Sequence, residues 1–78
     1  MGRRIKRAAL DIMPRVKYRE LLQLLHADGW RHDRTRGSHM MYVHSTKPGP
    51  LVVPAGGKEG QDVPRGTLNS ILRQAGLK

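Results

Sequence analysis

Histidine is the residue type of this chain best suited to moving protons near neutral pH. The chain has four of them: His26, His32, His39 and His44. His39 differs in its neighbours, because it directly follows Gly37 and Ser38, which carry no bulky side chain. An imidazole at such an open turn could serve as a general acid or base towards a bound molecule.

Positive charges gather around His39 in the sequence. Arg31, Arg34 and Arg36 precede it closely, and Lys47 is expected to approach from the next turn. Guanidinium, ammonium and backbone N–H groups all bind phosphate oxygens. We therefore predict a phosphodiester site in which these groups hold the phosphate and the imidazole touches the sugar. The alternative is that His39 is a structural residue at the start of a strand, which is the commoner role at that position.

The other histidines have simpler interpretations. His26 fits a half-exposed position on a helix, and His32 fits the surface of a strand. A zinc site is disfavoured because the histidine spacings match no standard ligand pattern and the chain has no cysteine. We predict neither a metal nor a cofactor.

Two segments have the apolar periodicity of core-facing helices. In KYRELLQLLHADGW the periodic residues are Tyr18, Leu21, Leu22 and Leu25, and Gly29 suits the helix end. In the C-terminal segment they are Leu68, Ile71, Leu72 and Ala75, with Pro64 suited to the first helical position and Gly76 to the residue past the end.

Three strands are expected between these helices, at residues 30–36, 39–44 and 51–54. The pair Gly37-Ser38 suits a tight hairpin, and STKPGP supplies the second turn. The run RGSHM also resembles the remnant of a cleaved tag, but it lies mid-chain between two strand-like runs and is treated as native. Helix, three strands and helix with short connections predict an α+β fold, with an antiparallel sheet and both helices on one face.

Alternation along the second strand assigns its side chains to two faces. If His39 points outward, Met41 and Val43 share its face, whereas Met40 and Tyr42 point towards the helices, barring a bulge. The candidate base would then lie on the face that the helices leave open.

The charge of the chain favours a polyanionic partner. Fifteen Lys and Arg residues against six acids give a formal net charge of +9 and a sequence pI near 11.2. Nucleic acid is the commonest such partner, and an acidic protein is the alternative. The absence of cysteine excludes disulfides and fits a reducing compartment, so we expect a cytoplasmic protein. No apolar run is long enough to span a membrane, and no membrane partner is predicted.

The first sixteen residues are expected to form a flexible basic extension to a domain at residues 17–78. This extension has too few apolar residues to pack strongly, so removal of residues 1–12 should leave the fold intact. Met13 would also serve as an alternative start.

From Lys17 to Lys78 the chain resembles the HicA family of bacterial toxins. The residues that carry the resemblance are KYRELLQLLHADGW, GSHMMYVH, VVP and GTLNSILRQAGL, in that order. The resemblance implies a fold like that of double-stranded RNA-binding domains. It also implies a small endoribonuclease of a toxin–antitoxin module that cleaves mRNA, with His39 as its essential residue. The implied partners are mRNA and a HicB-like antitoxin, and DNA is reached only indirectly through that antitoxin.

RNA carries its own nucleophile, the 2′-hydroxyl, so we expect metal-independent cleavage with neutral His39 as general base. The general acid stays open among His44, His32 and water. Many family members carry a further histidine after the strand-ending proline, but Pro54 is followed here by alanine and two glycines, with Lys58 as the nearest charge. The competing functions are a non-catalytic RNA-binding module of the same fold and a domain that binds an acidic protein.

Overall fold

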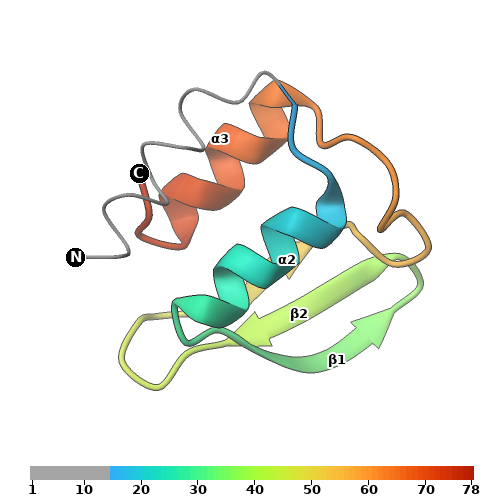
Figure 1. The fold of residues 1–78 in the computed structure, drawn as a ribbon. Helices are drawn as coiled ribbons and strands as arrows, with labels where there is room; N and C mark the ends of the chain where they lie inside the picture. Colours follow the sequence, from blue (N-terminus) through green and yellow to red (C-terminus); the bar gives the residue numbers. More distant parts are fainter. Residues whose placement is uncertain (1–14) are drawn as a thin grey trace.

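The computed structural model describes residues 15–78, in which one sheet is combined with two helices (Figure 1). The elements are α2 (Tyr18–Ala27), β1 (Arg31–Arg36), β2 (His39–Val43), β3 (Leu51–Val53) and α3 (Arg65–Gln74). The predicted order of helix, three strands and helix is therefore confirmed.

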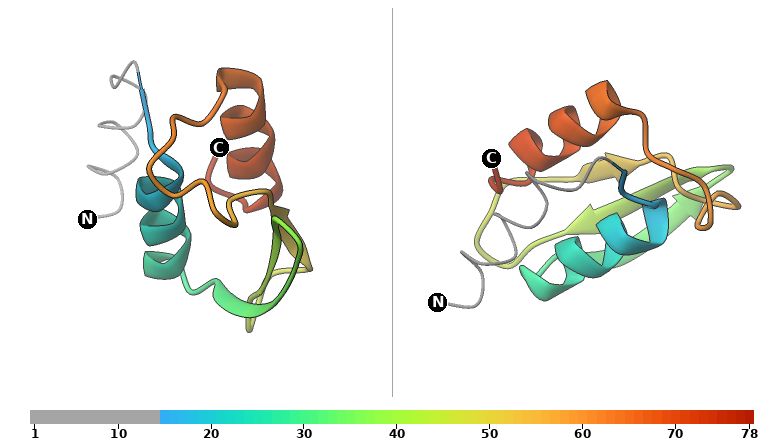
Figure 2. Two further views of the ribbon diagram at one scale, coloured as in Figure 1. Left: turned by 90° about the vertical axis from the view of Figure 1, so that its right-hand side faces the viewer. Right: turned by 45° about the horizontal axis from the view of Figure 1, so that its top comes forward.

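The sheet is antiparallel with the order β1-β2-β3, so β2 is its central strand. Both helices lie on the same side of it, as the two views in Figure 2 show. Tyr42, Leu51 and Val53 point into the layer between sheet and helices and are buried, whereas Val52 on the opposite face is 39% exposed. The predicted fold class, including the placement of both helices on one face, is confirmed.

The core is aliphatic except for two tyrosines and one tryptophan. The helices contribute Tyr18, Leu21, Leu25, Ile71 and Leu72, and the C-cap of α3 contributes Ala75. Trp30 is fully buried. It directly follows Gly29, whose φ of +105° lets the chain turn sharply from α2 towards β1. Each large apolar side chain buried in this way contributes about 1.5–3 kcal/mol to folding.

The C-terminal helix differs slightly from the sequence prediction at its start. Pro64 is the N-cap, and the helix begins at Arg65 rather than at the proline. Gly76 adopts a φ of +74° just after the helix, as its predicted place past the helix end requires.

The described part of the chain begins close to the predicted boundary of the domain. Val16 was assigned to the basic extension, yet it is 2% exposed and its carbonyl accepts a hydrogen bond from the Val63 N–H at 2.7 Å. The domain therefore extends at least to Val16, because that residue belongs to the core. The rest of the predicted extension, Arg15 excepted, and the start at Met13 lie outside the described residues.

Across residues 15–78, neither helix has the length and apolar character needed to cross a lipid bilayer.

Candidate active site

The turn that carries His39 is a two-residue hairpin loop. Gly37 and Ser38 connect β1 to β2, and Arg36 pairs directly with His39 across the two strands. Gly37 has a φ of +60°, and no residue other than glycine has a positive φ in the described chain. This pattern fits a type II′ turn, in which only the first central residue needs a positive φ. The predicted hairpin is confirmed.

The loop that follows β3 packs against this turn. The Gly56 N–H donates a hydrogen bond to the Ser38 carbonyl at 2.9 Å. A Cβ atom added at Gly56 would lie 3.1 Å from the Ser38 Cα and 3.2 Å from the Gly37 carbonyl oxygen. Gly56 is therefore suited to its position by the close approach of two backbones, which holds the turn from one side.

His39 is exposed, and within residues 15–78 its imidazole makes no hydrogen bond. The neighbouring Ser38 is half-buried by the loop that follows β3. The backbone at the turn is thus held while the imidazole of His39 stays open to solvent. This is the arrangement that a general base needs to reach a bound substrate.

The three predicted arginines share a face of the sheet with His39. Arg36 pairs with His39, Arg34 with Met41, and Arg31 with Val43. Directly paired residues of an antiparallel sheet point to the same face, and Met41 and Val43 lie on the face opposite the helices. All six residues of β1 are exposed. The structure therefore places Arg31, Arg34 and Arg36 in a row that begins beside His39.

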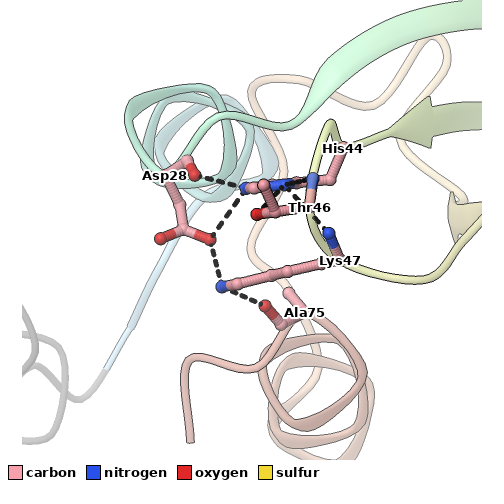
Figure 3. Close-up of polar contacts among 5 residues, drawn as sticks. All are labelled: Asp28, His44, Thr46, Lys47 and Ala75. Atoms are coloured by element: carbon pink, nitrogen blue, oxygen red, sulfur yellow. Dashed lines mark hydrogen bonds and ion pairs between the residues drawn. The ribbon is translucent and has the colours of Figure 1, made fainter.

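Lys47 lies elsewhere. Its Nζ contacts Asp28 Oδ2 at 2.5 Å and the Ala75 carbonyl at 2.9 Å, so it joins the C-terminal ends of α2 and α3 (Figure 3). This position follows the end of β2, whereas His39 begins that strand. The expectation that Lys47 approaches the turn is corrected, because its ammonium group is engaged at the opposite end of the sheet.

His44 also belongs to this opposite end. Its side chain is 8% exposed and packs edge-on against Trp30 with ring centroids 5.1 Å apart. The Thr46 N–H donates to Nδ1 at 3.0 Å, so the proton of the neutral ring lies on Nε2, which donates to the Asp28 carbonyl at 2.7 Å (Figure 3). Because both nitrogens are occupied far from His39, the structure does not bring this candidate general acid to the turn.

His32 points to the other face of the sheet. It pairs with Tyr42, and its ring packs edge-on against the Tyr42 ring at 5.6 Å. Its Nε2 lies 2.6 Å from the Thr35 hydroxyl. Burial, and to a smaller extent the negative charge of Glu59, raises the pKa of Tyr42, so that phenol stays protonated at neutral pH. Neither His32 nor Tyr42 faces His39 across the turn.

Comparison with known protein families identifies the family of this chain. Residues 18–77, which are most of the chain, match the model of the family described as HicA toxin of bacterial toxin–antitoxin. The chain belongs to the HicA toxin family. It is thus a toxin of a toxin–antitoxin module, as the resemblance implied. No curated protein matches the chain.

Two features of this HicA site were not anticipated from the sequence. The first is the contact between Gly56 and the turn, for which the only signal was the pair Gly56-Gly57 in the segment after Pro54. The second is an irregularity in β1 between His32 and Arg34, which leaves Asp33 without a partner. The sequence carried no signal for it, because β1 has no apolar alternation that would reveal a change of face.

Proposed function

We propose that this HicA toxin is an endoribonuclease that cleaves mRNA with His39 as general base. The observation that carries the proposal is the exposed imidazole of His39, free of hydrogen bonds to the described residues, on a turn held by Gly56 and directly paired with Arg36. The family membership supports a toxin, and the positive charge of the chain supports a nucleic-acid substrate.

In this mechanism the neutral imidazole of His39 takes the proton of a ribose 2′-hydroxyl. The 2′-oxygen attacks the adjacent phosphorus, the bond from phosphorus to the 5′-oxygen breaks, and that oxygen takes up a proton. The products are a 2′,3′-cyclic phosphate and a 5′-hydroxyl. One well-placed base accelerates such a reaction by about 10²–10⁴-fold. In this proposal the guanidinium of Arg36, the strand partner of His39, stabilises the charge that develops on the phosphorane.

The proton for the leaving 5′-oxygen comes from water in this proposal. His44 is held by Asp28 and Thr46 at the far end of the sheet, and His32 lies on the opposite face from His39. Solvent reaches the turn freely because His39 and Gly37 are both exposed. A toxin can act slowly and still arrest growth, so a dedicated acid is not needed.

Regulation in this proposal is by a cognate HicB-like antitoxin in the cytoplasm. Because the toxin is strongly basic, an antitoxin with an acidic surface would bind it at a high association rate. Blocking the Gly37–His39 turn is sufficient for inhibition, so we expect the antitoxin to cover His39 and to contact DNA on behalf of the pair. A complex that leaves His39 open to solvent would contradict this arrangement.

The decisive experiment compares wild type with His39→Ala on long single-stranded RNA in EDTA. The variant should fold as wild type, because an exposed imidazole anchors no core packing, and should bind RNA while losing cleavage. Circular dichroism, RNA binding and cleavage are measured on the same preparation. Cleavage by His39→Ala at the wild-type rate contradicts the mechanism. RNA binding by the wild type without any cleavage would instead identify a non-catalytic RNA-binding module.

A further inference from the structure

The three arginines of β1 are evenly spaced along the sheet. Their partners on β2 are His39, Met41 and Val43, which are alternate residues of that strand. Two residues of an antiparallel strand span about 6.8 Å, so successive arginines are separated by about that distance along the strand direction. This is close to the distance between neighbouring phosphates in an extended nucleic-acid strand.

The bulge at Asp33 creates this even spacing. Without it, simple alternation would place Arg31 on the face opposite Arg34 and Arg36, because Arg31 and Arg34 are three positions apart, an odd number. Because β1 has one extra residue at the bulge, Arg31 lies on the same face as Arg34 and Arg36 and pairs with Val43 of β2. The irregularity therefore converts an unevenly spaced set of arginines into a regular row.

The arginine row is available to a ligand. Arg34 contacts Asp33 at 3.8 Å, but the two side chains are 71% and 52% exposed, and such an exposed pair contributes little to stability. Asp33 is the only acid among the strand residues that carry or adjoin the row on the described sheet. Beside the row lie Met41, Val43 and the exposed Val52, which offer apolar contact to riboses and bases.

We propose that this row, Arg31, Arg34 and Arg36, binds three successive phosphates of a single-stranded RNA that leaves the cleavage site at His39 along β1. The inference rests on the proposed function, which supplies RNA as the substrate. It adds that this RNA is single-stranded and that it runs along β1. A duplex is a poorer fit because the phosphates of each strand wind around the helix axis and leave a straight row. Apart from His39, the strand residues that the structure describes on this face include no aromatic side chain for base stacking, so we expect recognition by backbone charge that tolerates different sequences.

A charge-neutral exchange tests the path of the RNA. Arg34→Thr combined with Thr35→Arg moves one guanidinium from the outer face to the helix-side face and leaves the net charge of the chain unchanged. The probe is a short 2′-O-methyl oligoribonucleotide, which cannot be cleaved through its 2′-oxygen, used single-stranded and as a duplex. Affinity is measured by fluorescence anisotropy over a series of salt concentrations.

Each lost phosphate contact should reduce the slope of log Kd against log salt by about 0.7 for a single strand. The exchange variant and Arg34→Gln should show the same reduction and the same weakened binding. Arg73→Ala removes one exposed charge from α3, on the far side of the molecule, and should leave the slope unchanged. Circular dichroism establishes that each variant is folded, and Arg34→Gln keeps the test valid if the exchange variant fails to fold.

Three outcomes would overturn the proposal. The first is an unchanged slope in both Arg34 variants, and the second is equal affinity for the duplex and the single strand. The third is an Arg34 variant that binds RNA normally but is no longer inhibited by the antitoxin. That result would assign this face of the sheet to a protein partner. Because the probe is not cleaved, these results are independent of whether His39 is the base, so each proposal can fail alone.

Discussion

At the residue scale, His39 and His44 have different surroundings in the structure. His39 is exposed on the turn that Gly56 contacts, whereas the side chain of His44 is 8% exposed and has both ring nitrogens in hydrogen bonds. In the sequence both histidines lie at the ends of the predicted strand at residues 39–44, so their position in that strand does not distinguish them. The distinction arises from tertiary structure, since Asp28 and Trp30, which contact His44, come from the end of α2 and the segment after it.

His44→Ala should therefore behave in the opposite way to His39→Ala. Loss of the buried imidazole leaves the Asp28 carbonyl and the Thr46 N–H without their partner and opens space beside Trp30. We expect a loss of about 2–4 kcal/mol in the free energy of unfolding. Cleavage per folded molecule should stay normal, because His44 does not reach the turn. Denaturant unfolding and RNA cleavage measure the two effects, and a stable His44→Ala protein without cleavage would show that His44 acts in the chemistry.

At the element scale, apolar periodicity predicted both helices, and strand-like runs separated by turn residues predicted the three strands, within about one residue at most ends. Tyr18, Leu21 and Leu25 recur at helical spacing and are buried, and the pair Gly37-Ser38 defines the hairpin. The sequence could not reveal features that depend on contacts between elements. The bulge at Asp33 lies in an all-polar strand with no pattern to disturb, and the role of Gly56 depends on a turn that is distant in sequence.

Gly56→Ala tests how the loop after β3 holds the turn. The added Cβ would be 3.1–3.2 Å from backbone atoms of Gly37 and Ser38, which cannot move as a flexible side chain can. We expect the turn to shift by a few tenths of an ångström, with a loss of about 1–3 kcal/mol in stability and a clear fall in the rate of RNA cleavage. The measurements are thermal unfolding and cleavage rate.

Gly66→Ala is the matched control for this substitution. Gly66 lies in the first turn of α3, where, among residues 15–78, no atom outside the adjoining residues and the backbone of the helix itself comes within 4 Å of the added Cβ, and its φ is not positive. Alanine there should stabilise the protein by about 0.4–1 kcal/mol and leave cleavage unchanged. Equal effects of the two substitutions would show that the Gly56 contact is unimportant.

At the scale of the whole molecule, the two ends of the sheet make different contacts. One end carries the Gly37–His39 turn with the loop that follows β3 beside it. At the other end Lys47 connects Asp28 at the end of α2 to Ala75 at the end of α3 (Figure 3). Both helix ends present carbonyl groups there, and a cation near a helix C-terminus is stabilising. The second end thus fixes both helices on the sheet, and the proposed RNA site lies at the first end.

Lys47→Met tests this separation, since it removes the ammonium group but keeps most of the apolar stem. The Asp28 carboxylate, 10% exposed, would lose its cation, and the Ala75 carbonyl would lose a donor. Charge-assisted hydrogen bonds of this kind contribute about 1.5–3 kcal/mol, so the free energy of unfolding should fall by a similar amount. Double substitution with Asp28→Asn should cost less than the sum of the single changes, because the two groups share one interaction. RNA affinity and its salt dependence, measured at a temperature where the variant is fully folded, should match those of wild type. A loss of RNA affinity without a loss of stability would restore Lys47 to the RNA-binding set and overturn the division between the two ends.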